Sequence, residues 1–118
     1  MVRRLFQILF VALLAGLLVL SLYPSIQGPD VPEGGDKLAH FLMYFTLAAV
    51  GAIGWPSRTT LALLALPLLG FGLEVAQIPI PGRGFEWGDA LANSIGAFCG
   101  VAVIALALRV PMRRGERV

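Results

Sequence analysis

Three short sets of polar side chains stand out in a chain of which 58% of the residues are hydrophobic. Within each set the residues are three or four apart, which places them on one face of a helix. The sets are Asp36, His40 and Tyr44; Glu74 and Gln77; and Asp89 and Asn93. A carboxylate beside a histidine can serve as a general base, and polar groups converging in an apolar setting can hold a ligand.

These residue types support two kinds of chemistry. For catalysis, His40 is the candidate acid or base and Asp36 the group that orients it. Glu74 or Asp89 would hold the substrate or a metal. For binding, an anion would be held mainly by two cations, Lys37 and Arg83. The ligand-binding candidates are Lys37, Tyr44, Gln77, Arg83, Asp89 and Asn93.

Metal binding is a weaker interpretation of the same residues. Asp36, His40, Glu74 and Asp89 offer oxygen and nitrogen ligands to a divalent cation. Their spacing matches no recognised ligand signature, so we predict no metal site from the sequence, and it identifies no cofactor.

Each candidate also has a purely structural interpretation. Asp36 and Asp89 can cap helices, because acidic side chains favour the first helical turn. Glu74 can form an ion pair with Arg83, and Asn93 can bridge two helices.

The elements that must position these residues follow from the hydropathy pattern. Only 14% of the residues are charged, far below the share of about 25% in a soluble domain. A membrane-spanning helix needs roughly 20 apolar residues. We predict one all-α domain over 1–118, an integral membrane bundle of four transmembrane helices at about 5–23, 37–54, 59–78 and 89–108.

Charge predicts the orientation of this bundle. One side would carry seven basic residues against Glu116, and the other would carry Lys37 and Arg83 against six carboxylates. Basic loops stay in the cytoplasm, so we predict that both termini are cytoplasmic and that the polar sets face outward. The seven are Arg3, Arg4, Arg58, Arg109, Arg113, Arg114 and Arg117. Nucleic acid is not an expected partner, because the basic residues form no stripe.

Two further features concern the helices themselves. Arg3 and Arg4 before an apolar run also suit a secretory signal, but the run is long and no A-x-A-like cleavage site follows, so we predict a retained helix. Gly96 and Gly100 form a GxxxG motif, which favours close packing within the bundle; a homodimer through these glycines is the alternative.

Three blocks of this sequence resemble the VanZ-like family of small bacterial membrane proteins. They are DKLAHFLMYFTLA from Asp36, GFGLEVAQ ending at Gln77, and PGRGFEWGDALANSIGAFCG from Pro81 to Gly100. The resemblance implies a multi-pass protein of the cell membrane whose founding member is an accessory to glycopeptide resistance, affecting teicoplanin. It implies no reaction.

Two functions follow as expectations. The first is a binding or accessory protein of the cell envelope that engages the lipid bilayer and an anionic lipid-linked or cell-wall ligand through Lys37 and Arg83. The alternative is a membrane enzyme that uses His40 with Asp36 and Glu74 on a lipid-linked substrate. Whether the chain is an enzyme is left open.

Overall fold

The structure, a computed structural model of the chain, describes residues 1–24 and 35–109. Within these residues the secondary structure is entirely helical. The helices are α1 (Val2–Leu22), α2 (Gly35–Gly54), the short 3-10 helix η1 (Pro56–Arg58), α3 (Thr59–Ala76) and α4 (Trp87–Arg109). Of the charges used to predict orientation, Asp30, Glu33, Arg113, Arg114, Glu116 and Arg117 lie outside the described residues.

The prediction of four membrane-spanning helices is confirmed. In the described part of the chain, four helices are long and apolar enough to cross a membrane. Their bounds differ from the predicted ranges by at most three residues: α1 begins at Val2 rather than 5, and α3 ends at Ala76 rather than 78. Hydropathy marks apolar residues rather than helix ends, so α1 extends through Arg3 and Arg4, whereas the apolar Ile78 follows the end of α3.

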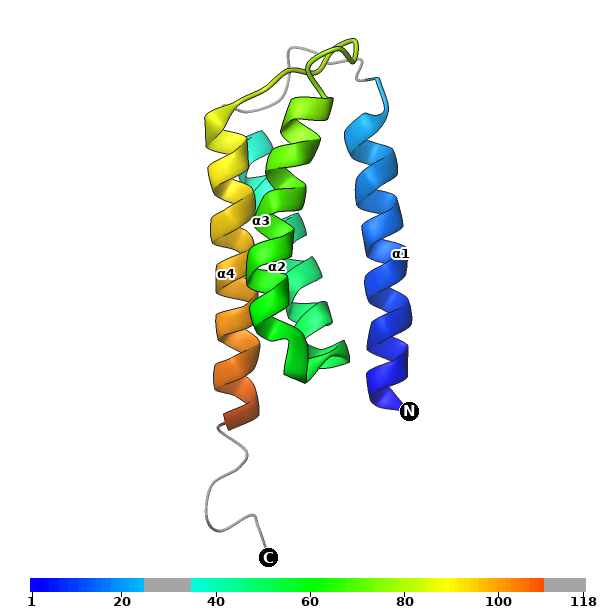
Figure 1. Cartoon of the computed structure of the whole chain (residues 1–118), viewed down its shortest axis with the longest axis vertical. Coiled ribbons are helices and arrows are strands. Elements are labelled where there is room, and N and C mark those ends of the chain that lie inside the picture. Colours follow the sequence, from blue (N-terminus) through cyan, green and yellow to red (C-terminus); the bar gives the residue numbers. More distant parts are fainter. Residues whose placement is uncertain (25–34, 110–118) are drawn as a thin grey trace, which may run out of the picture.

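The four long helices run alternately up and down (Figure 1). Val2 and Arg109 therefore lie at one end of the bundle. The opposite end, which we call the site end, holds the last turns of α1 and α3 and the first turns of α2 and α4 (Figure 1). All three predicted polar sets lie at or near the site end.

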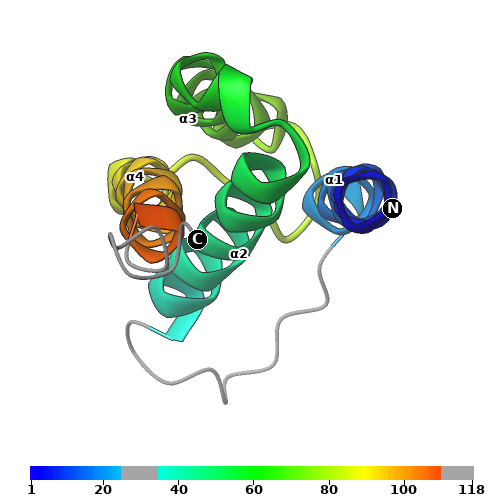
Figure 2. The ribbon, with the colours of Figure 1, turned by 90° about the horizontal axis from the view of Figure 1, so that it is seen from below.

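Helix α2 occupies the centre of the bundle and packs against the other three helices (Figure 2). The buried apolar core lies between α2 and the helices packed against it. Its members are Leu17, Tyr44, Leu47, Ala48, Leu66, Leu73, Ala97 and Val101. Large apolar side chains such as Leu64, Leu68 and Phe98 are more than 60% exposed, and such a surface suits lipid rather than water.

The GxxxG motif brings α2 and α4 together. A Cβ atom on Gly96 would collide with the main-chain oxygen of Phe41, and one on Gly100 with that of Phe45. The glycines thus allow the two backbones to touch, which is the internal packing that the sequence favoured. A homodimer through the same glycines stays a prediction, and it would require α2 to leave this face.

Hydrogen bonds and an aromatic contact hold helix α1 near both of its ends, and apolar packing holds it in between. At the end away from the site, Gln7 donates a hydrogen bond to the main-chain oxygen of Gly54 at 2.9 Å, and the Phe10 ring packs edge-on against Trp55. At the site end, Gln77 and Arg83 donate to its last carbonyl groups. Between these attachments Leu17 packs into the buried core, and an apolar groove of about 400 Å³ lies beside it between α1 and α2.

Candidate functional site

Polar side chains from α2, α3 and α4 meet at the site end, as the spacing of the three sets predicts. Four of them are at least nine-tenths buried: Glu74, Gln77, Asp89 and Asn93. Tyr44 is 1% exposed and lies one turn deeper than His40 on α2. The three helices therefore share one buried polar site.

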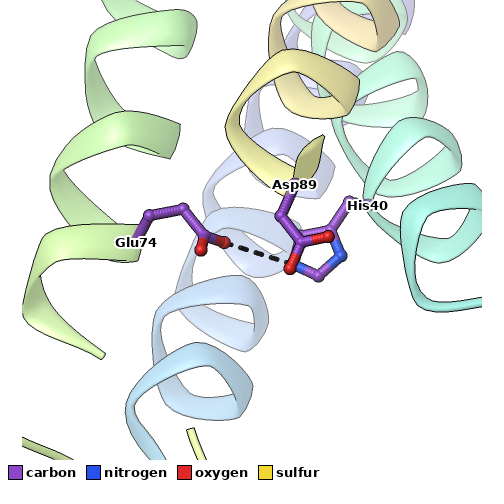
Figure 3. A group of neighbouring side chains, drawn as sticks. All are labelled: His40, Glu74 and Asp89. Atoms are coloured by element: carbon purple, nitrogen blue, oxygen red, sulfur yellow. Dashed lines mark ion pairs between the residues drawn. The ribbon is translucent and has the colours of Figure 1, made fainter. Parts of the chain in front are cut away.

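His40 and Glu74 face each other across the boundary between α2 and α3 (Figure 3). Nε2 of His40 lies 3.6 Å from Oε1 of Glu74, and the other carboxylate oxygen accepts a hydrogen bond from the Glu86 main-chain N–H at 3.2 Å. Among the described residues this replaces the alternative pairing of Glu74 with Arg83. Arg83 makes its hydrogen bonds to α1 instead.

The ring of His40 is oriented by main chain rather than by a side chain. Nδ1 lies 2.6 Å from the Asp36 carbonyl oxygen. Because a carbonyl oxygen can only accept, Nδ1 carries a proton, and in the neutral ring the lone pair is on Nε2, facing Glu74. The sequence assigned this orienting role to the Asp36 side chain, but the carboxylate of Asp36 lies near Lys37 instead.

Lys37 is surrounded by carboxylates. Its Nζ lies 2.8 Å from Glu86, 3.6 Å from Asp89 and 3.7 Å from Asp36. The ion pairs with Glu86 and Asp89 join the start of α2 to the loop before α4 and to its first turn. The Lys37 charge, expected to meet an anionic ligand, is therefore compensated within the chain.

Gln77 and Arg83 hold the last turn of α1, where helical carbonyl groups lack partners within their own helix. Nε2 of Gln77 donates to the Ser21 oxygen at 2.9 Å. Arg83 donates from Nη2 to Leu20 at 2.7 Å and from Nε to Tyr23 at 3.2 Å. Both predicted ligand residues thus have a structural role as well.

Two buried oxygens at the site have no hydrogen-bond partner among the described residues: Oδ1 of Asp89 and Oδ1 of Asn93. Leaving such an atom unsatisfied costs about 1–3 kcal/mol, more for a charged group. Asn93 also packs against α3, because a Cβ on Gly70 would lie 2.9 Å from the Asn93 side chain. It therefore bridges helices by close contact.

Two cavities open at this site. The inner one, of about 140 Å³, lies among α1, α2, α3 and α4, and its polar lining residues are Ser21, His40, Tyr44, Glu74, Gln77, Arg83 and Asn93. The outer one, of about 330 Å³, is lined by residues of α2, of α4 and of the segment between α3 and α4. Its polar lining residues are Asp36, His40, Gln77, Arg83, Glu86 and Asp89. His40, Gln77 and Arg83 line both cavities, so they connect the inner site to the surface.

Glu86 is the residue of the site that the sequence analysis missed as a candidate. It contributes a main-chain N–H to Glu74 and a carboxylate to Lys37. Its position three residues before Asp89 is the one available signal, because that spacing continues the polar face of α4 toward the loop. The main-chain contact leaves no trace in the sequence.

Fold and site together define a multi-pass membrane protein with a buried polar site at one end of a four-helix bundle. The sequence model of the VanZ/LLP1 family matches residues 5–108. The chain belongs to this family. No curated protein and no solved structure matches it.

Proposed function

We propose that this chain is a binding or accessory protein of the cell envelope, resident in the cell membrane, which holds a lipid-linked ligand at an outward-facing site end. One observation carries the proposal: the polar inner cavity and the apolar groove between α1 and α2 have four lining residues in common. These are Leu17, Leu20, Ala39 and Met43. A molecule with a polar head and a long apolar chain fits this combination.

The groove suits the apolar chain of such a ligand. Its wall is formed by small and aliphatic residues, and Gly16 at its centre has no neighbouring atom within 4 Å of the place where a Cβ would stand. Acyl or prenyl chains bind through apolar area rather than through specific polar contacts. The groove therefore offers apolar contact area but little chemical selectivity.

The polar head would be recognised where the inner and outer cavities meet. Arg83 is the cation on this path: Nε and Nη2 donate to α1, and Nη1 has no hydrogen bond to the described residues. A phosphate or carboxylate can accept from this remaining nitrogen, and Gln77 and His40 line the same path. The acidic cluster around Lys37 would direct an anion to the Arg83 side.

A binding measurement tests this proposal. The protein is reconstituted in nanodiscs and titrated with a polyprenyl-diphosphate-linked cell-wall precursor, with the corresponding uncharged polyprenol as comparison. We expect saturable binding of the precursor and at least about tenfold weaker binding of the polyprenol, because one charge-assisted contact is worth about 1.5–3 kcal/mol.

Variants of matched charge complete the experiment. Arg83→Gln should weaken precursor binding, whereas Arg58→Gln, at the other end of the bundle, should not. Equal affinity for precursor and polyprenol, or equal effects of the two variants, would contradict the proposal. In cells, a teicoplanin-resistance role predicts that Arg83→Gln lowers resistance by more than its effect on protein abundance accounts for.

The arrangement of His40 and Glu74 favours a second candidate, a membrane enzyme acting on a lipid-linked substrate. The Asp36 carbonyl fixes the Nδ1 proton of His40, so Nε2 can exchange a proton with a substrate or with Glu74. This candidate predicts that the purified protein converts a lipid-linked precursor and that His40→Gln abolishes the product. Absence of turnover across such precursors, with and without divalent metals, would leave the binding role alone.

A further inference from the structure

We propose that Nε2 of His40 and one carboxylate oxygen each from Glu74 and Asp89 bind a divalent transition-metal ion, with Zn²⁺ as the best match. Figure 3 shows the three side chains, which come from α2, α3 and α4. This inference goes beyond the ligand-binding role proposed above and does not depend on it. It concerns a set of three ligands that come from a single chain.

The geometry is that of a ligand set. One ligating atom from each of the three residues lies within 4.8 Å of the other two. Around a tetrahedral Zn²⁺ with bonds of about 2.0–2.1 Å, neighbouring ligand atoms are separated by about 3.4 Å. The 3.6 Å between His40 Nε2 and Glu74 Oε1 is close to that separation.

The tautomer and ring orientation of His40 suit metal coordination through Nε2. A metal-ligating histidine typically donates its second ring N–H to a carbonyl or carboxylate, which fixes the tautomer and the ring plane. His40 makes this contact through Nδ1 to the Asp36 carbonyl oxygen. Its Nε2 lone pair is directed toward Glu74, where the proposed ion would lie.

The net charge of the side chains around this site also favours a bound cation. Glu74 is 2% exposed and Asp89 7% exposed, and burying two carboxylates close together is costly unless a cation compensates them. The nearby described charges are Lys37 and Arg83 against Asp36, Glu74, Glu86 and Asp89. With a neutral His40 this leaves two negative charges, which a divalent ion neutralises.

Buried oxygens without a hydrogen bond give a second indication. Oδ1 of Asn93 has no partner among the described residues; Asn93 lies one turn beyond Asp89 on α4 and lines the inner cavity together with His40 and Glu74. Oδ1 of Asp89 also accepts no hydrogen bond from the described residues, because Nζ of Lys37 stays 3.6 Å away, and a metal bond would satisfy it. The site thus presents more oxygen acceptors than the described residues satisfy by hydrogen bonds.

The donor set also selects the metal. An imidazole with two carboxylates suits Zn²⁺, Mn²⁺ or Fe²⁺, whereas Ca²⁺ and Mg²⁺ prefer oxygen ligands alone. A neighbouring all-carboxylate group, Asp36, Glu86 and Asp89, has ligand atoms at similar separations. All three members of that group lie within 3.7 Å of the Lys37 ammonium, which would repel a metal ion held among them. Of the proposed ligand set, only Asp89 has an ion pair with Lys37.

The test is a Zn²⁺ titration of the full chain in detergent micelles, without lipid-linked ligand. The protein is purified through a tag free of histidine and carries Cys99→Ala, which removes the single thiol. Competition with a chromophoric chelator gives stoichiometry and affinity. We expect one Zn²⁺ per chain, and at least a tenfold excess of Ca²⁺ or Mg²⁺ should not displace it.

Matched substitutions locate the site. His40→Gln, Glu74→Gln and Asp89→Asn should each weaken Zn²⁺ binding by at least about tenfold. Substituting a residue that only hydrogen-bonds to a metal ligand already costs about 10- to 100-fold in affinity, and loss of a ligand itself should cost no less. The controls Asp36→Asn and Glu86→Gln remove carboxylates of the neighbouring group and should change the affinity by less than about threefold. Helicity by circular dichroism identifies any variant that fails to fold.

Thermal unfolding provides a second measurement, because an ion that binds the folded state alone raises the Tm. Saturating Zn²⁺ should raise the Tm of the parent and of both control variants, but not that of the three ligand variants. The proposal is overturned if the parent binds no Zn²⁺ stoichiometrically or if the control variants lose as much affinity as the ligand variants. Because no lipid is present, neither result depends on the proposed ligand-binding function.

Discussion

Arg83 donates a hydrogen bond from Nη2 to the main-chain oxygen of Leu20 at 2.7 Å, across 63 positions of sequence. This contact joins the loop before α4 to the last turn of α1. Arg83, which the sequence predicts to bind an anionic ligand, therefore also holds the C-terminal end of α1 in place.

Replacing Arg83 should loosen α1 at the site end. Arg83→Gln removes two hydrogen bonds to α1 carbonyl groups, and we expect a loss of about 1–2 kcal/mol in the free energy of unfolding. Hydrogen exchange should increase most in the last turns of α1. Arg58→Gln, at an exposed position of η1, is the control, and an equal loss of stability there would contradict the role of Arg83.

The contact between α2 and α4 predicts an unequal response of two helical glycines to the same substitution. Gly96→Ala places a methyl group against the Phe41 carbonyl oxygen and should destabilise the bundle by more than about 2 kcal/mol. Gly72→Ala enters open space on α3 and should be neutral or stabilising, since alanine favours helix by about 1 kcal/mol over glycine. Membrane abundance and thermal unfolding in detergent measure both.

Lys37 should stabilise the site end through the carboxylates around it. Lys37→Met leaves Asp36, Glu86 and Asp89 without their shared cation, so we expect a lower Tm than that of the parent chain. Salt screens the repulsion between charges near the surface, so the loss in Tm should be smaller at high than at low salt concentration. A loss that is the same at both salt concentrations would show that Lys37 acts through packing alone.

The apolar groove can be filled without disturbing the core. Gly16→Leu projects a side chain into the space between α1 and α2, where no atom lies within 4 Å of the added Cβ. We expect binding of a polyprenyl-linked precursor to fall at least about fivefold while the Tm changes by less than about 3 °C. Gly72→Leu, which also enters open space but outside the groove, should leave binding intact; equal effects would argue against the groove.

The orientation predicted from charge can be tested with single cysteines in a Cys99→Ala background. Gly84→Cys lies in the exposed loop at the site end, and Ser57→Cys lies in η1 at the other end. In intact cells, a membrane-impermeant thiol reagent should label Gly84→Cys and not Ser57→Cys until the membrane is opened. The reverse pattern would place the site on the cytoplasmic side.

The sequence predicts the helices and the convergence of the polar sets because lipid imposes a strong pattern. Charged residues are excluded from the spans, so His40, Glu74 and Asn93 stand out in an apolar background, and equal depth brings them together. Once the helices pack side by side, these polar groups are buried against one another. For this reason the sites of membrane bundles are unusually visible in sequence.

The hydrogen-bond and ion-pair partners of these residues are much harder to predict from the sequence. The Asp36 carbonyl that orients His40, the Glu86 N–H that binds Glu74, and the carbonyl groups that receive Arg83 all belong to the main chain, which is the same for every residue type. The pairing of Glu74 with His40 rather than Arg83 depends on how α2 and α3 are rotated about their axes. Helical periodicity in one sequence does not determine that rotation.

The hydrogen bonds that hold α1 affect how far its sequence can change. At its site end, Leu20, Ser21 and Tyr23 contribute main-chain oxygens, so their side chains are free to change as long as the helix and its hydrophobicity persist. Gln7 is different, because its own side chain makes the contact with Gly54. Helix α1 can therefore diverge in sequence far more readily than α2, α3 and α4 without losing its place in the molecule.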